Sequence, residues 1–211
     1  MKKLLVLFLL ATSTIFAQDN EANKLLNEVS TKAKSYNNIS IAFKYVLENT
    51  EENIKQETKG DVVMEGDKYR LNILGITRIY DGQNIYSISP EDEEVTVSKG
   101  SDQDESTITP SKMLTFYKEG FTFKMDIVQD VSGRKIQYVK LSPMDSNSEI
   151  KYVLLGIDTK TKHIYRLIEV GKNGTKTTLT VNSFKTNETL SKSLFTFDKN
   201  KFKEYYINKL D

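Results

Sequence analysis

Hydrophobic side chains recur with a helical period in the first part of the chain that follows residue 17. Asp19 can cap this helix, and Asn37-Asn38 ends it. The apolar positions that fall on one face are Leu25, Leu26, Val29, Ala33 and Tyr36. The pattern therefore predicts an amphipathic helix with one face to bury.

From residue 39 onward the period changes to two, which is typical of strands with one apolar face. Turn signals such as Asp81-Gly82 and Ser132-Gly133 separate short alternating runs. Pro110, with Thr109 as a cap, predicts a second helix that ends at Gly120. The strands are expected at 39–47, 62–64, 69–73, 76–80, 84–89, 94–98, 121–127, 136–141, 151–158, 164–170 and 177–184.

An antiparallel sheet of this size tends to curl, so that its apolar face lines a concavity. Two amphipathic helices must also bury their apolar faces, and the concavity offers the place. We therefore expect a mainly β, α+β fold in which an incomplete antiparallel barrel of about eleven strands carries helices as a lid over an apolar cavity. In one interpretation this cavity is a filled core; in the other it admits an apolar ligand when a helix moves.

The alternation also predicts which side chains line the cavity, because residues of the same parity share a face of a strand. The cavity residues expected are Ile41, Phe43, Tyr45, Leu47, Tyr69, Leu71, Ile73, Phe121, Phe123, Met125, Ile127, Val153, Leu155 and Ile157. The lid residues expected are Leu25, Leu26, Val29, Met113, Leu114 and Phe116. Methionines such as Met113 and Met125 suit packing against an irregular ligand.

Residues 1–17 have the pattern of a secretory signal peptide. Lys2 and Lys3 precede a short apolar run, and Ala17 offers a small residue for cleavage. The expected product, residues 18–211, is one exported domain. The chain contains no Cys, which excludes disulfides and a lipid-modified N-terminal Cys. We therefore expect a soluble periplasmic protein, and a monomer.

The composition excludes several other functions. Thirty Lys and Arg against 29 Asp and Glu give a net charge of +1, which offers no field for nucleic acid. The one histidine, His163, falls in an expected turn and has no second His to share a metal. Nucleophile and phosphate-binding motifs are absent from the sequence. We therefore expect no enzymatic activity, no cofactor and no metal.

Several segments in order resemble the outer-membrane lipoprotein carrier family, the LolA-like periplasmic chaperones. The quoted segments are Ile41-Ala42-Phe43, Gly60-Asp61, the run from Tyr80-Asp81-Gly82 to Pro90, Thr109-Pro110 with Met113-Leu114, and Phe195-Thr196-Phe197. The resemblance implies an incomplete barrel covered by helices. It also implies a carrier that takes acylated lipoproteins from an inner-membrane, ATP-driven transporter and passes them to an outer-membrane acceptor.

One feature of that family is missing here. Its proteobacterial members have an Arg-Pro after the Gly-Asp strand, and that arginine latches the lid. Glu65-Gly66-Asp67 occupies this place, and Arg70 matches no equivalent position. Two other functions remain open from the sequence: a module of the same fold that senses lipids or lipoproteins without ferrying them, and an envelope enzyme acting on lipid or glycan.

Overall fold

The fold is mainly β, with one α-helix at residues 20–34 in the described part of the chain. The computed structural model describes residues 20–102, 110 and 112–210, so the expected signal peptide lies outside it. The contacts divide the chain into two compact units. The first unit is Met1–Ala33, Leu47–Lys55 and Tyr117–Thr178, and the second unit is Lys34–Val46, Gln56–Phe116 and Leu179–Asp211.

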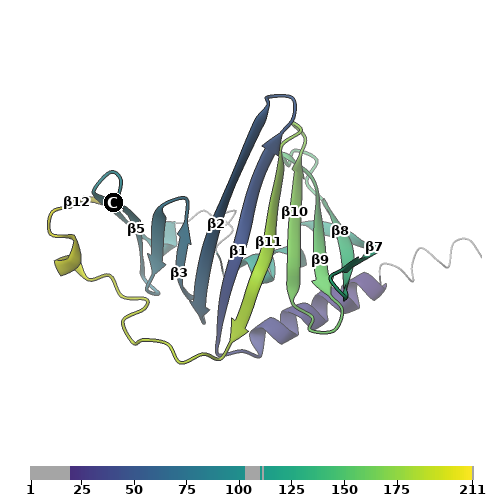
Figure 1. Cartoon of the computed structure of the whole chain (residues 1–211), viewed down its shortest axis with the longest axis horizontal. Helices are drawn as coiled ribbons and strands as arrows, with labels where there is room; N and C mark the ends of the chain where they lie inside the picture. The colour runs from purple at the N-terminus through teal and green to yellow at the C-terminus, as the bar shows by residue number, and fades with distance from the viewer. Residues whose placement is uncertain (1–19, 103–109, 111, 211) are drawn as a thin grey trace, which may run out of the picture. The chain divides into compact units, whose positions relative to one another are not determined.

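Within the described residues, twelve strands form one hydrogen-bonded sheet in the order β12-β6-β5-β4-β3-β2-β1-β11-β10-β9-β8-β7, so β12 and β7 are its edges (Figure 1). The strands are β1 (Asn38–Asn49), β2 (Ile54–Glu65), β3 (Lys68–Ile73), β4 (Ile76–Tyr80), β5 (Asn84–Ser89), β6 (Glu94–Lys99), β7 (Phe121–Val131), β8 (Arg134–Pro143), β9 (Ile150–Asp158), β10 (Ile164–Gly171), β11 (Lys176–Thr186) and β12 (Tyr206–Lys209).

The first unit contains the meander β7-β8-β9-β10, in which each neighbour pairs antiparallel. Ser132 and Gly133 both have positive φ, as a type I′ two-residue hairpin turn requires. The helix lies against the turn between β9 and β10, where its Glu28 forms an ion pair of 2.8 Å with Lys162. Its apolar face is buried against this unit, with Leu26 and Val29 only 3% and 2% exposed.

The second unit contains the meander β2 to β6, also antiparallel. Its C-terminal segment folds back over one face of β4, β5 and β6. There Phe197, Phe202 and Tyr205 pack on a buried cluster of Ile79, Ile88 and Val95. The segment includes the 3-10 helix η4 (Lys199–Phe202) and ends in β12, which pairs parallel with β6.

The eleven expected strands are all present, and a twelfth, β12, was missed. It is only four residues long, and its partner β6 lies more than a hundred positions earlier, so no local pattern announces it. The expected second α-helix is wrong for the described residues, which form two 3-10 turns, η2 (Lys112–Leu114) and η3 (Phe116–Lys118). A segment this short cannot repay the cost of nucleating an α-helix.

Asp158 organises the turn between β9 and β10. Its Oδ1 accepts hydrogen bonds from the backbone N–H of Lys160 (2.9 Å) and Thr161 (3.0 Å), and the residue is 6% exposed. Burial alone would raise the pKa of this carboxyl, but the hydrogen bonds and the nearby Arg134 outweigh it and lower the pKa. The ionised carboxylate therefore stabilises the folded turn.

We expect Asp158→Asn to lower the free energy of unfolding by about 1–2 kcal/mol near neutral pH. A depressed carboxyl pKa contributes stability above the unfolded-state pKa, and this contribution disappears as the pH falls through the folded-state pKa. The gap between the two proteins should therefore narrow in acid, below about pH 4. Urea unfolding at a series of pH values measures this gap, and a gap independent of pH would contradict the assignment.

Candidate functional site

The first apolar face belongs to the first unit and is formed by side chains that lie opposite one another on β7, β8, β9 and β10. One row runs Phe123, Leu141, Val153 and Glu169, and the next runs Met125, Val139, Leu155 and Leu167. Cross-strand partners in antiparallel sheets point to the same side, so these rows share a face. The expected alignment of Phe123 and Met125 with Val153 and Leu155 is therefore confirmed.

The exposed fraction of the side chains falls steeply along these rows from β7 to β9. Val153, Leu155 and Ile157 are at most 1% exposed, as are Val139 and Leu141, so they form close-packed core. Phe121, Phe123 and Met125 on the edge strand β7 are only half-buried. The first apolar face therefore continues from core into apolar surface that a ligand can reach.

Ile127 was expected on this face, and that expectation is wrong. The β7–β8 register shifts between Met125 and Val128, which marks a bulge, and Ile127 is 63% exposed. The Gln137 side-chain amide donates to the carbonyls of Asp126 (2.8 Å) and Ile127 (3.4 Å), satisfying the backbone that the bulge leaves unpaired. A bulge breaks the two-residue alternation, so parity no longer predicts the face beyond it.

A carboxyl side chain that the sequence analysis missed, Glu169, lies in the first row directly opposite Val153. It is partly buried, and this burial raises its pKa. In the sequence, Glu169 stands two residues after Leu167, at a position where the strand alternation favours an apolar side chain. The side chain of Glu169 therefore offers the apolar face one polar contact.

The helix residues expected in the lid are firmly anchored in the first unit. Leu25 is 8% exposed, and the hydroxyl of the buried Tyr117 donates to the carbonyl of Leu26 at 3.1 Å. Burial raises the pKa of Tyr117, which keeps the hydroxyl protonated as a donor. The other lid candidates, Met113, Leu114 and Phe116, are half-buried in the 3-10 segment of the second unit. Movement of any of these residues as a lid stays a prediction.

The second apolar face belongs to the second unit. Val62 lies opposite Leu71, and Met64 opposite Tyr69, which in turn lies opposite Tyr80. Met64 and Tyr69 are 5% and 1% exposed, whereas Leu71 and Ile73 are half-buried. Arg70 pairs with Val63 and Ile79 and so lies on the other side of the sheet. It therefore cannot contact a ligand on this face.

Phe43 extends the second apolar face onto β1. A side chain at Gly60 would meet the Phe43 ring at 2.6 Å, so the ring lies directly against this glycine of β2. Ile41 is 9% exposed and Tyr45 is half-buried; Leu47, further along the strand, is half-buried and belongs to the first unit. The cavity residues predicted in the second unit thus lie on one apolar face. Some of their side chains on this face are buried, and others are half-buried.

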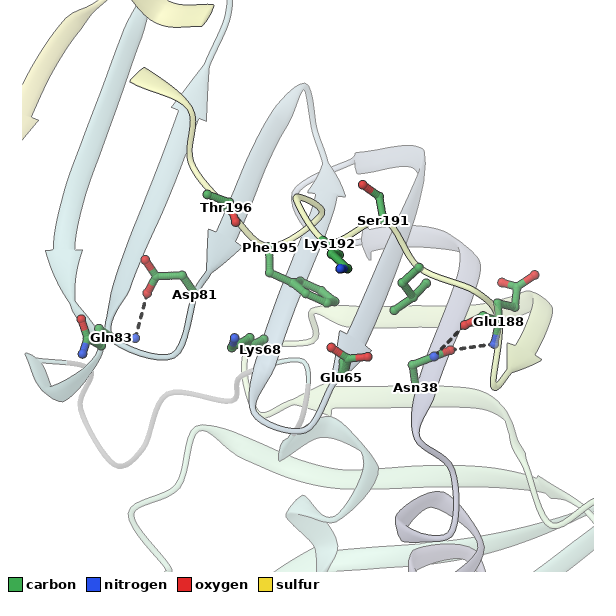
Figure 2. Close-up of a pocket in the computed structure, with 11 residues that line it drawn as sticks. Asn38, Glu65, Lys68, Asp81, Gln83, Glu188, Ser191, Lys192, Phe195 and Thr196 are labelled. Atoms are coloured by element: carbon green, nitrogen blue, oxygen red, sulfur yellow. Dashed lines mark hydrogen bonds between the residues drawn. The ribbon is translucent and has the colours of Figure 1, made fainter. Parts of the chain in front are cut away.

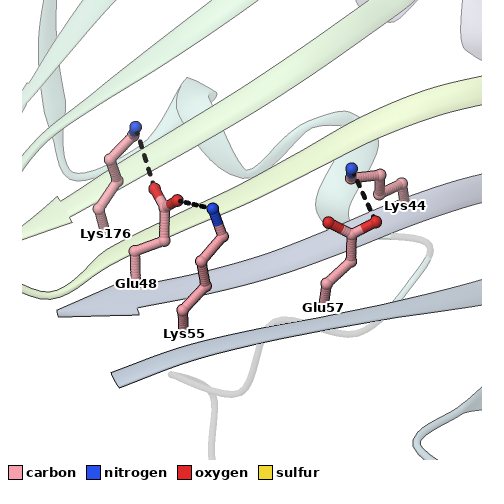
Figure 3. A network of polar contacts seen from close by, with 5 residues as sticks. All are labelled: Lys44, Glu48, Lys55, Glu57 and Lys176. Carbon is pink, nitrogen blue, oxygen red and sulfur yellow. Dashed lines mark hydrogen bonds and ion pairs between the residues drawn. The ribbon is translucent and has the colours of Figure 1, made fainter. Parts of the chain in front are cut away.

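The intervening residues of β1 form ion pairs, shown in Figure 3. In the second unit Lys44 Nζ lies 2.8 Å from Glu57 Oε1. In the first unit Glu48 contacts Lys55 at 3.4 Å and Lys176 at 3.3 Å, which lowers the pKa of Glu48. The even-numbered residues Lys44 and Glu48 thus form ion pairs at positions that lie between the odd-numbered apolar residues of β1.

A polar groove of about 410 Å³ lies elsewhere in the second unit, between the β2–β3 and β4–β5 turns and residues 188–196 (Figure 2). Asp81 Oδ1 accepts from the backbone N–H of Gln83, and Asn38 both donates to and accepts from the backbone of Glu188. Lys68 and Lys192 also line it. Its acids and lysines are mixed, so its charge selects no class of ligand.

No cluster of three or more His, Cys, Asp or Glu that could bind a metal occurs among the described residues. His163 lies in the β9–β10 turn as expected. It is partly buried, and burial and Lys32 lower its pKa against the opposing effect of Asp158. Within the same described part of the chain, the helix is too short and too polar to cross a membrane.

Comparison with solved structures shows the same fold in two proteins of very different sequence, and a third structure is similar at a lower score. An uncharacterized conserved protein from Thermus thermophilus is 10% identical with a TM-score of 0.57, over 90% of this chain and 99% of that one. LprF from Mycobacterium bovis is 10% identical with a TM-score of 0.50, over 82% and 97%. The LolA superfamily protein NE2245 from Nitrosomonas europaea is 10% identical with a TM-score of 0.43, over 84% and 98%.

No curated protein sequence matches the chain. The model of one protein family, described as outer membrane lipoprotein carrier protein LolA, matches residues 34–198. This span is well over half of the chain and includes β1 to β11, with both apolar faces. The protein with these two half-accessible apolar faces therefore belongs to the LolA family.

Proposed function

We propose that this protein binds the acyl chains of lipoproteins on its apolar faces and carries lipoproteins through the periplasm from the inner to the outer membrane. The observation that carries the proposal is the half-buried apolar row of β7, which continues the core of the first unit into accessible surface. The family match over residues 34–198 supports it.

The energetics of acyl chains explain why such a surface is useful. Each CH₂ group costs about 0.8 kcal/mol when it is exposed to water, so a lipoprotein with several chains cannot cross the periplasm unshielded. The carrier must also release the lipoprotein, so acyl-chain binding has to be reversible. A face made partly of adaptable side chains such as Phe123 and Met125 shields the chains without a rigid, closed pocket.

The partners in this proposal are an inner-membrane lipoprotein-releasing transporter and an outer-membrane lipoprotein acceptor. The transporter supplies the free energy of extraction from ATP, so the carrier itself needs no nucleotide site. The expected signal peptide at residues 1–17 supports export to the periplasm. The acyl chains of the lipoprotein bind to the apolar faces. Glu169 can form one polar contact with the group that links the acyl chains to the protein.

The test is formation of a soluble carrier–lipoprotein complex. Residues 18–211 are mixed with donor membranes that contain labelled triacylated lipoprotein, with and without ATP, and the supernatant is separated by size exclusion. We expect a one-to-one complex only with ATP. The same lipoprotein lacking its acyl groups serves as the control and should form none.

The proposal fails if a folded carrier and an active donor give no complex. It fails equally if the unacylated lipoprotein is bound as well as the acylated one. Binding of free lipids without release of lipoprotein from membranes would favour a lipid-sensing module instead.

A further inference from the structure

The hairpin that joins β3 to β4 in the second unit ends in exposed apolar residues. Ile73 pairs with Ile76 across the ladder, so the turn between them consists of two residues, Leu74 and Gly75. Leu74 is 61% exposed and Ile76 is 41% exposed. A side chain built at Gly75 would meet no atom within 4 Å, so open space surrounds the end of the turn. We name residues 73–76 the apolar tip.

The backbone of the apolar tip makes its leucine unusual. Leu74 has a φ of 54° and Gly75 a φ of 77°, as in a type I′ turn, whose first position favours Asn, Asp or Gly. The other described non-glycine residues with positive φ are all polar or charged: Asn53, Glu93, Ser132, Lys162 and Asn187. A leucine here costs free energy twice, once for its backbone conformation and once for its exposure to water. Folding alone therefore does not explain it.

The apolar tip continues the second apolar face. Along β3 the side chains on this face are the buried Tyr69 and then the half-buried Leu71 and Ile73. Ile76 lies opposite Ile73 and extends the face onto β4, where it is exposed. The exposed fraction therefore increases along the face from Tyr69 to Ile76. An acyl chain bound on this face has a path outward along apolar side chains.

Polar side chains directly behind the apolar tip limit how deeply it can be buried. Thr77 Oγ1 donates to Asn72 Oδ1 at 2.8 Å, and the Asn72 side-chain amide donates to Asp61 Oδ2 at 2.8 Å. Arg78 is exposed, and its Nε donates to Ser87 Oγ on β5 at 3.3 Å. The tip itself contains no charged residue. Apolar contact is therefore confined to the turn and the residues on either side of it.

These features favour a lipid bilayer over a protein as the partner that covers the apolar tip. A stable protein interface buries about 800 Å² on each partner, and three aliphatic side chains on a two-residue turn cannot supply that area. Insertion into a bilayer needs less surface, because aliphatic side chains gain free energy by entering the hydrocarbon while polar ones stay among the head groups. A narrow tip with polar side chains only behind it meets this requirement.

We propose that the apolar tip inserts into the surface of a lipid bilayer and places the accessible end of the second apolar face against the membrane. Leu74 and Ile76 enter the hydrocarbon, and Asn72, Thr77 and Arg78 stay among the head groups. Acyl chains then pass between this face and the bilayer without crossing water. That last step rests on the proposed function, whereas insertion of the tip requires no cargo.

The chain contains no Trp, so a single introduced tryptophan reports on its own surroundings. Leu74→Trp is compared with Ser132→Trp in residues 18–211. Ser132 is the matched control, because it is exposed, has positive φ and holds the same position in the two-residue turn between β7 and β8. Each variant is mixed with phosphatidylcholine vesicles whose acyl chains carry bromine, which quenches tryptophan on contact. We expect a shift to shorter wavelength and quenching for Leu74→Trp, and neither for Ser132→Trp. Absence of quenching for Leu74→Trp would overturn the proposal, and so would equal quenching of both variants, because tryptophan itself would then drive insertion.

A second variant, Leu74→Asn, separates insertion from a structural role of the leucine. Asparagine adopts positive φ more readily than leucine, so the midpoint of urea unfolding should rise. Transfer of labelled lipoprotein from the preformed complex to protein-free phosphatidylcholine vesicles should nevertheless slow about tenfold or more. Formation of the complex with donor membranes should not change. Met144→Asn removes an apolar side chain that is 69% exposed elsewhere, and should leave transfer unaltered.

Normal transfer by Leu74→Asn would overturn the proposal. Equally slow transfer by Met144→Asn would also overturn it, because any exposed apolar side chain would then serve. A lower urea midpoint for Leu74→Asn would show that the leucine stabilises the fold instead. If none of these proteins forms a complex with lipoprotein, the proposed carrier function fails, and the tryptophan measurement alone decides whether the tip inserts.

Discussion

Replacing Phe123 by glutamate is expected to abolish acyl-chain binding while the protein stays folded. Phe123 lies in the half-buried part of the first apolar face, on the edge strand β7, opposite the core residue Leu141. A glutamate there can turn its carboxylate to water in the free protein. A bound acyl chain would cover this carboxylate, and burying an unpaired charge costs several kcal/mol. The affinity should therefore fall at least about a hundredfold.

The measurement is binding of a fluorescent fatty-acyl probe, together with the carrier–lipoprotein complex described above. Thr122→Glu is the matched control, because it adds the same charge to an exposed neighbour on the other side of β7. This control should bind as the original protein does. A folded Phe123→Glu protein that carried lipoprotein normally would show that the first apolar face is not the acyl site.

Gly60→Val should destabilise the protein more than any other substitution discussed for the second unit. A Cβ at residue 60 would lie 2.6 Å from the Phe43 ring and 2.7 Å from the carbonyl oxygen of Asn72. The ring can shift, but the carbonyl belongs to the backbone of β3 next to the β2–β3 ladder and cannot move cheaply. We expect a loss of about 3 kcal/mol or more in the free energy of unfolding.

Urea unfolding followed by circular dichroism measures this loss. Thr58→Val is the control, since it places valine on the same side of β2 two residues away, at a position that already carries a branched side chain. It should change stability by less than about 0.5 kcal/mol. Phe43→Leu should recover part of the Gly60→Val loss, because it removes one of the two clashes. A stable Gly60→Val protein would mean that Phe43 does not lie against β2.

Periodicity was a reliable guide wherever neighbouring residues fixed the geometry. Alternation over Ile41–Leu47, Tyr69–Ile73 and Phe121–Met125 predicted strands whose apolar members share a face, and the cross-strand pairs confirm it for the last two. The turn at Ser132-Gly133 was also predicted from its residues, and both have positive φ, as in a type I′ two-residue hairpin. The resemblance to the LolA family was likewise carried by short segments in order.

Parity failed where the strand itself was irregular. Ile127 has the right parity but follows the β7 bulge, and the side-chain amide of Gln137 that satisfies the bulged carbonyls comes from the partner strand. Nothing within β7 distinguishes a regular strand from one that a neighbour stabilises in a bulged form. The alternation pattern also did not identify Glu169 as a member of the apolar face, because its side chain is polar.

Local spacing and turn chemistry along the chain were enough to predict the class of fold, eleven of its strands and the N-terminal helix, and the resemblance of short segments was enough to predict the family. The packing of distant segments, by contrast, was needed to show that the C-terminal segment covers β4 to β6 and that β12 pairs parallel with β6. These contacts join residues about a hundred positions apart. Such long-range pairing depends on which apolar faces pack together in the folded protein. Many different sequences can provide such faces, so the pairing produces no periodic pattern along the chain.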